Sequence, residues 1–205
     1  MIKIYADAGS NLFPSFLKEN NLDIKVLNMQ LVYKDKVVNC YDDDFNIDEF
    51  GKTFYDDMRK GVVPVTSLVN QYTFEKAFKK DVEDGHQIIC FTMAKGISGT
   101  YQSALVSANE INNKYGKTLI HVVDSMTAGF GEGLQAIHAY KLVQDGLSFS
   151  KIVQEVEEYK LRVRSEFSVD NIKYLRKTGR IGAIVMRFIN ILSIKIMLRG
   201  GPQLK

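Results

Sequence analysis

The 205-residue sequence contains no tryptophan, three histidines, three prolines and two cysteines. Cys40 and Cys90 lack metal-ligand spacing, so we expect two small buried apolar groups rather than a disulfide or a metal site, as suits a reducing cytosol. No apolar run approaches the roughly 20 residues of a membrane span. The first residues also lack the charged and apolar regions of a signal peptide. These absences predict a soluble protein of the cytoplasm with no integral membrane segment.

Basic residues exceed acidic residues only slightly. The chain carries 27 basic and 24 acidic residues, which gives a formal net charge of +3. Nucleic-acid-binding proteins usually carry a concentrated basic stripe, and here the charges are scattered. The sequence therefore predicts no nucleic-acid partner, although basic residues gather in the last quarter.

Apolar segments that predict strands alternate along the chain with amphipathic segments that predict helices. The predicted strands cover residues 3–6, 24–33, 87–93 and 119–123. The predicted helices cover residues 14–20, 47–60 after a cap at Asn46, 74–82, 101–111 with a stop at Gly116, and 133–144. This alternation favours an α/β fold with a mostly parallel sheet that helices cover on both faces.

The pattern changes after Gly146, and we place a domain boundary near residue 150. Residues 1–150 form the predicted α/β domain. Residues 151–205 begin with a helix and a short exposed strand at 165–169, and little sequence remains to close a second core. We interpret this part as the start of an incomplete C-terminal domain.

Four loops should meet where ligands bind in such folds, at the carboxyl ends of the parallel strands. They are residues 7–10, 66–67, 95–100 and 124–133. Their hydroxyls and backbone N–H groups near helix N-termini suit a carboxylate or phosphate. The loops contain no histidine or cysteine, and we identify no glutamate placed to act as a strong base, so their nucleophiles lack activation. The simpler alternative is that these residues only cap helices and form turns.

Other chemistry is poorly supported. The three histidines fall outside the four loops, and we interpret them as structural or surface residues. Residues 42–48 resemble a calcium loop, but Ile47 and Thr53 stand where its glycine and closing glutamate belong. The glycine-rich run 129–133 lacks the lysine of a P-loop. We therefore expect no metal site and no nucleotide cofactor.

One run carries a specific resemblance. Residues 96–104, Gly-Ile-Ser-Gly-Thr-Tyr-Gln-Ser-Ala, lead from a predicted strand into a helix and resemble the hallmark of the DegV family. Further matches follow in the same order as in that family. They are Asp7, Thr66-Ser67, Asp124-Ser125 with Gly131 and Gly133, residues 167–181, and residues 190–195. The resemblance covers essentially the whole chain.

The resemblance implies an N-terminal α/β domain and a C-terminal α+β domain with a lipid tunnel between them. It implies a non-enzymatic carrier that binds a long-chain fatty acid (C14–C18) by its carboxylate and presents it to a fatty acid kinase catalytic subunit, with no cofactor. Thr66 would bind the head group, assisted by backbone N–H groups near Ser98. The full ligand-binding set implied is Thr66, Ser67, Lys95, Ser98, Gly99, Thr100, Asp124, Ser125 and Phe130. Ile189, Leu192 and Ile194 would help to line the tunnel, and Arg176, Lys177 and Arg180 would face the kinase or the acyl phosphate.

The chain departs from the family pattern where head-group hydroxyls are common. Ala8, Ala94 and Gly129 replace usual serines, Lys95 adds a charge that could pair with the carboxylate, and other changes fall at residues 68–70 and 196. The family also runs longer. Two alternatives stay open: a degenerate or regulatory module that binds a partner protein without lipid, and a hydrolase or transferase using Ser98 or Ser125 with Asp7 or Asp124.

Overall fold

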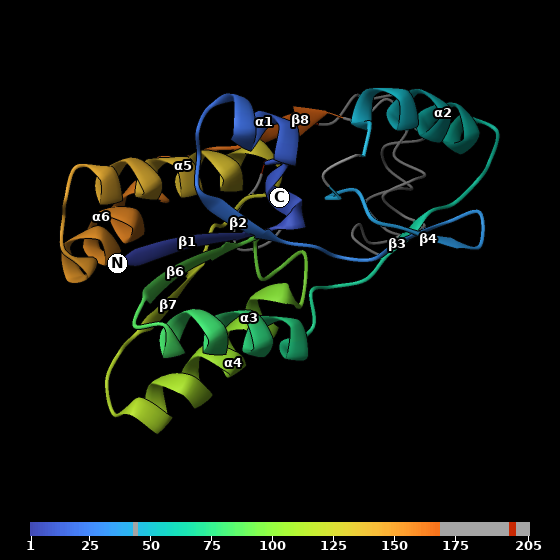
Figure 1. Ribbon diagram of the computed structural model, residues 1–205. Coiled ribbons are helices and arrows are strands. Elements are labelled where there is room, and N and C mark those ends of the chain that lie inside the picture. Colours follow the sequence, from blue (N-terminus) through green and yellow to red (C-terminus); the bar gives the residue numbers. More distant parts are fainter. Residues whose placement is uncertain (43–44, 169–196, 200–205) are drawn as a thin grey trace.

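A computed structural model of the chain describes residues 1–42, 45–168 and 197–199. Its centre is a sheet of four parallel strands in the order β2-β1-β6-β7 (Figure 1). These strands are β1 (Ile2–Asp7), β2 (Ile24–Leu27), β6 (Gln87–Thr92) and β7 (Ile120–Asp124). Because all four run the same way, their carboxyl ends lie at one edge of the sheet, where ligands bind in folds of this kind.

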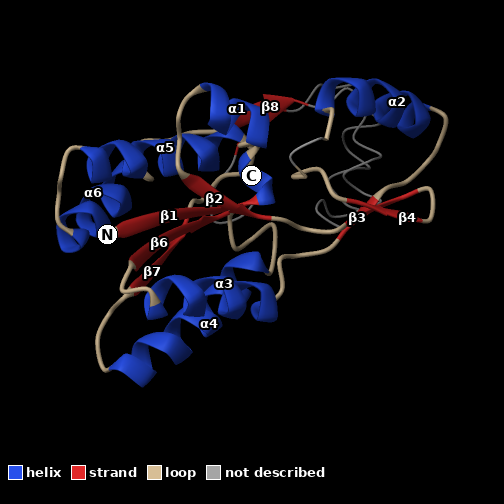
Figure 2. Cartoon of the chain, in the orientation of Figure 1, coloured by secondary structure: helices blue, strands red, loops and turns tan. Residues whose placement is uncertain are grey.

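Helices cover both faces of the sheet (Figures 1 and 2). One face carries α3 (Gln71–Glu83) and α4 (Thr100–Tyr115). The other carries α5 (Phe130–Gln144) and α6 (Phe149–Tyr159), with the short α1 (Pro14–Glu19) beside them. The predicted α/β architecture, with a parallel sheet between two helical layers, is confirmed.

Each face of the sheet has its own apolar core, because successive strand side chains point to opposite faces. Tyr5 and Cys90 pack on the side of α3 and α4, whereas Ile4 and Phe91 pack on the side of α5. Ile152 and Val156 of α6 are buried in this second core. Helix α6 therefore packs against the core formed by the first 150 residues, and the domain boundary near residue 150 stays a prediction.

A second, small sheet lies beside the main one, with antiparallel order β4-β3-β5. Its strands are β3 (Leu31–Tyr33), β4 (Lys36–Val38) and β5 (Val65–Thr66). Tyr33 joins this sheet to α2 (Ile47–Arg59) by ring contacts with Phe50 and Phe54. The predicted β segment 24–33 is thus divided between two sheets. A further antiparallel pair joins β8 (Glu166–Ser168), where an exposed strand was predicted, to β9 (Met197–Arg199).

Local sequence sets several element ends. The Asn46 side chain accepts a hydrogen bond from the Glu49 N–H and caps α2, as predicted. Gly116 ends α4 in the left-handed region, with φ of 64°. Helix α5 begins at Phe130, earlier than predicted. It contacts a short 3₁₀ turn (Ala8–Ser10) that is distant from it in the sequence.

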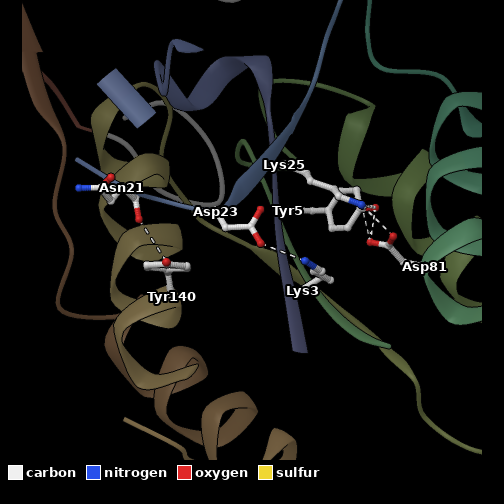
Figure 3. A network of polar contacts seen from close by, with 7 residues as sticks. All are labelled: Lys3, Tyr5, Asn21, Asp23, Lys25, Asp81 and Tyr140. Atoms are coloured by element: carbon white, nitrogen blue, oxygen red, sulfur yellow. Dashed lines mark hydrogen bonds and ion pairs between the residues drawn. The ribbon is translucent and has the colours of Figure 1, made fainter. Parts of the chain in front are cut away.

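A polar network joins β1, β2 and α3 on the first face of the sheet (Figure 3). The Lys25 Nζ lies 2.8 Å from both Asp81 oxygens, and the Tyr5 hydroxyl donates to Asp81 Oδ2 at 2.8 Å. Burial alone would raise the pKa of Asp81, but hydrogen bonds from Lys25 and Tyr5 outweigh it and hold this pKa below its ordinary value. The carboxylate is therefore charged and fully partnered.

Candidate functional site

The carboxyl ends of β1 and β6 are tied together by Asp7, which is fully buried. Asp7 Oδ1 accepts the Gly9 N–H at 2.6 Å, and Oδ2 accepts the Met93 N–H at 2.9 Å. Burial raises the pKa of Asp7 to about 6, while the two backbone N–H groups oppose that rise. Asp7 is thus occupied in holding two loops rather than exposed to a ligand.

Asp124 plays a similar part at the end of β7. Its Oδ1 accepts the backbone N–H groups of Lys95 at 3.2 Å and Met126 at 3.1 Å. The next residue, Ser125, is buried, and its hydroxyl donates to the carbonyl of Thr127 at 3.3 Å. Both predicted site residues therefore fix the loop that leads into α5.

The hallmark run forms the start of α4. Ser98 Oγ accepts the Thr100 N–H at 3.2 Å and lies 2.9 Å from Thr100 Oγ1, while Thr100 itself is buried. The N–H groups of Ile97 and Ser98 donate to the Ala94 carbonyl. Within the described part of the chain, the Gly99 N–H has no hydrogen-bond partner and remains available to a ligand.

One cavity joins this helix start to the small sheet. Its volume is about 300 Å³, and it brings together Thr66, Ser67, Ser98 and Gly99, four of the predicted ligand-binding residues. The other lining residues are apolar: Met29, Leu68, Met93 and Ile97. Ser67 Oγ accepts the Gln30 N–H at 3.1 Å, which leaves its proton free to donate. We call these eight residues the head-group cavity; hydroxyl donors beside apolar walls suit an amphipathic anion.

The other predicted ligand-binding residues do not line this cavity. Thr100, Asp124 and Ser125 are buried and engaged with backbone groups, Lys95 faces solvent beside Asp124, and Phe130 is 64% exposed. Their roles in binding stay predictions. The residues predicted to line the acyl tunnel or to face a kinase lie outside the described residues: Arg176, Lys177, Arg180, Ile189, Leu192 and Ile194.

Sequence reasoning gave no role to Glu132, which does not line the head-group cavity but lies behind Asp7. Glu132 is fully buried in the first turn of α5, and its Oε1 accepts the Asp7 N–H at 3.1 Å. Burial, and then the charge of Asp7, raise the pKa of Glu132 well above its ordinary value. The sequence did contain a signal, since Glu132 is the single acidic residue in the first turn of the largely apolar helix α5.

Two of the departures from the family pattern have structural explanations. Ala94 is fully buried and its carbonyl accepts the N–H groups of the loop ahead, so a hydroxyl here would face the interior. Gly129 has φ of 63° and ψ of −142°, a conformation that favours glycine. Its N–H donates to the Gly9 carbonyl at 2.7 Å. These two positions therefore serve the backbone around the site.

The described histidines and cysteines lie outside the head-group cavity. His121 Nε2 lies 3.0 Å from Glu157 Oε1, His138 stacks on Tyr159, and neither lines the head-group cavity. Cys40 and Cys90 are both free; Cys90 is buried as predicted, whereas Cys40 is only partly buried, contrary to the prediction. Among the residues that the structure describes, no group of acids, histidines and cysteines could hold a metal ion. No helix in that same part of the chain has the length and apolarity to cross a membrane.

The family model of DegV proteins, described as uncharacterised, matches residues 1–200. This chain belongs to the DegV family. A DegV domain-containing protein of Clostridium perfringens strain 13 is 34% identical to it over 196 residues. That match covers 95% of this chain and 65% of the C. perfringens protein, so the chain spans about two thirds of its relative's length.

Solved DegV structures share the fold. A DegV family protein from Thermus thermophilus, described as fatty acid binding, superposes with a TM-score of 0.80 at 23% identity, covering 100% of this chain and 69% of that one. The fatty acid kinase (Fak) B3 protein of Streptococcus pneumoniae, loaded with linoleic acid, gives 0.74 at 22% identity, covering 100% and 71%. Structural neighbours of this DegV chain therefore bind fatty acids, and at these identities the likeness establishes the common fold.

Proposed function

We propose that this DegV protein binds a long-chain fatty acid, with its carboxylate in the head-group cavity. The observation that carries the proposal is that the Thr66, Ser67 and Ser98 hydroxyls meet the Gly99 N–H in one cavity with apolar walls, and that this N–H has no hydrogen-bond partner among the described residues. Such donors can surround a carboxylate without a neighbouring cation. The neighbours of the same fold that hold fatty acids support the assignment.

The acyl chain supplies most of the affinity in this proposal. Burial of each CH₂ contributes about 0.8 kcal/mol, so a chain of C14–C18 has ample driving force and the hydroxyls mainly fix its orientation. Met29, Leu68, Met93 and Ile97 provide apolar surface at the cavity itself.

The protein would act as a carrier in the cytoplasm and present the fatty acid to a separate kinase subunit, which would form the acyl phosphate. The hydroxyls of Ser98 and Ser125 support a binding role, because their partners within the described residues are hydroxyls and backbone groups rather than an imidazole or carboxylate. A hydrolase would need such a base beside its nucleophile.

The proposal is tested by native mass spectrometry of the purified protein, followed by solvent extraction. We expect a mass excess that matches a C14–C18 fatty acid. Thr66→Ala and Ser98→Ala should each weaken the uptake of added oleate by about tenfold, because each removes a hydrogen bond to a charged group. Thr53→Ala, an exposed position on α2, is the matched control and should bind as the unchanged protein does.

If the purified protein is empty and also fails to take up oleate or palmitate, the fatty-acid assignment is wrong, and the hypothesis of a partner-binding module remains. The kinase step has its own test, in which a bacterial fatty acid kinase catalytic subunit and ATP are added to the loaded protein. Acyl phosphate should appear only when both proteins are present. Acyl phosphate from the loaded protein and ATP alone would contradict the carrier role.

A further inference from the structure

A line of hydrogen bonds runs from α5, through β1, to the wall of the head-group cavity. Glu132 Oε1 accepts the backbone N–H of Asp7 at 3.1 Å. The Asp7 side chain then accepts the Met93 N–H at 2.9 Å, and Met93 lines the cavity. Asp7 also accepts the Gly9 N–H at 2.6 Å. Two hydrogen bonds, with Asp7 between them, thus connect Glu132 to the cavity wall.

Space around this line is tight. A Cβ atom built on Gly9 would lie 2.5 Å from Met93 Cε, 2.8 Å from Asp7 Oδ1 and 3.4 Å from Glu132 Oε2. A Cβ on Gly133, next to Glu132, would lie 2.6 Å from the Ser10 carbonyl oxygen. Gly9 thus lies closely packed among Met93, Asp7 and Glu132, and interiors packed this densely transmit small displacements.

The hydrogen bonds also indicate which of the two acids is charged. Asp7 accepts two backbone N–H groups, which favours its anionic form. Glu132 is fully buried, and its Oε2 has no partner among the described residues. Two buried carboxylates at one place repel each other, so the less solvated Glu132 holds the proton.

Among the residues that the structure describes, the other titratable groups facing this pair carry no positive charge. They are the Cys90 thiol on β6 and the Tyr41 phenol, which donates to the Ala8 carbonyl at 2.6 Å. Burial raises the pKa of both groups, so each is neutral near neutral pH. The charge of Asp7 is therefore balanced by N–H donors alone among the described contacts.

We propose that Glu132 is a positioning residue for the head-group cavity: it holds Asp7, and Asp7 holds the Met93 backbone in the cavity wall. Glu132 does so as the neutral acid. Its ionisation would place a second negative charge behind the wall and repel both Asp7 and a bound carboxylate. The effect on oleate binding rests on the proposed fatty-acid function, whereas the effect of Glu132 and Asp7 on the position of the Met93 backbone does not.

The test compares Glu132→Gln and Glu132→Leu with the unchanged protein. Oleate affinity is measured from neutral to alkaline pH, and hydrogen exchange is measured at the Met93 amide. Glutamine keeps the acceptor for the Asp7 N–H but cannot ionise. Its oleate affinity should lie within about twofold of that of the unchanged protein at neutral pH. The unchanged protein should bind oleate more weakly at alkaline pH, and Glu132→Gln should not. Leucine keeps the volume but removes the acceptor, and should bind about tenfold more weakly and exchange the Met93 amide faster.

Glu158→Gln, on the exposed side of α6, is the control for the loss of a carboxylate and should change neither measurement. Wild-type affinity and Met93 exchange in Glu132→Leu would overturn the positioning role. An unaltered pH profile in Glu132→Gln would overturn the role of the neutral acid, even if the leucine variant failed to fold. Failure of every variant and of the wild type to bind oleate would reject only the fatty-acid function, because Met93 exchange still tests the positioning.

Discussion

Lys95 is held to Asp124 twice, through its backbone and through its side chain. The Lys95 N–H donates to Asp124 Oδ1 at 3.2 Å, and its Nζ lies 3.8 Å from Oδ2. The backbone bond positions the loop whatever the side chain is, while the Lys95 side chain is 59% exposed. Exposed ion pairs of this kind contribute little.

Lys95→Met should therefore leave the free energy of unfolding within about 0.5 kcal/mol of the original value. It should also leave oleate affinity within about twofold, because Lys95 does not line the head-group cavity. Chemical denaturation and equilibrium binding check the two expectations. A loss of oleate affinity of about tenfold or more would revive the hypothesis that this lysine pairs with the carboxylate.

Gly133 and Gly51 offer a matched pair of helical glycines. A Cβ on Gly133 would lie 2.6 Å from the Ser10 carbonyl oxygen, whereas a Cβ on Gly51 in α2 would meet nothing within 4 Å. Gly133→Ala should lower the free energy of unfolding by about 1–3 kcal/mol, because backbone would have to move. Gly51→Ala should raise it by about 0.5–1 kcal/mol through helix propensity. Thermal or urea unfolding measures both changes. Equal effects of the two substitutions would contradict the close approach of Gly133 to the Ser10 carbonyl.

The network in Figure 3 gives a prediction with a defined pH dependence. Asp81→Ala removes the shared partner of Lys25 and Tyr5 and should cost about 2–3 kcal/mol of unfolding free energy. Because the pKa of Asp81 is lower when folded, its contribution is complete above the ordinary value of 3.8 and is lost as pH falls through the folded pKa. Asp81→Asn should accordingly show a smaller loss of stability in acid.

Asp23→Asn is the control for that experiment. Asp23 pairs with Lys3 in the same region, but its side chain is 66% exposed. We expect a change within about 0.5 kcal/mol at any pH. Comparable effects of the Asp23 and Asp81 substitutions would show that burial does not set the strength of these pairs.

The main sheet and its helices could be predicted because their signals are local. The apolar run of β6, the Asn46 cap and the Gly116 stop each act within a few residues. The small sheet could not be predicted in the same way, because β4 and β5 are only three and two residues long. Lys34 and Asp35, both at positive φ, turn β3 into β4 without the glycine that usually signals a hairpin.

The candidate site likewise contains residues with a local sequence signal and residues whose role depends on distant contacts. Thr66 and Ser98 could be assigned from the resemblance to the DegV pattern, and both line the head-group cavity. The expectation that Thr66 follows a parallel strand was wrong, because it lies in β5 of the small antiparallel sheet. Asp124 and Ser125 carry the same signal but bind backbone groups instead: Asp124 those of Lys95 and Met126, and Ser125 that of Thr127. The part played by Glu132 depends on contact with β1, which no local pattern contains.

The bond between Glu132 and Asp7 joins residues 125 positions apart in the chain. Domains begin to fold from the amino end as they leave the ribosome, and non-local contacts form late. Strand β1 can pair early with β2, but its other neighbour, β6, starts only at Gln87. The acid that holds Asp7 emerges later still. During synthesis, the hydrogen bond that fixes the Asp7 backbone can therefore form only after β1, β2 and β6 have all been made.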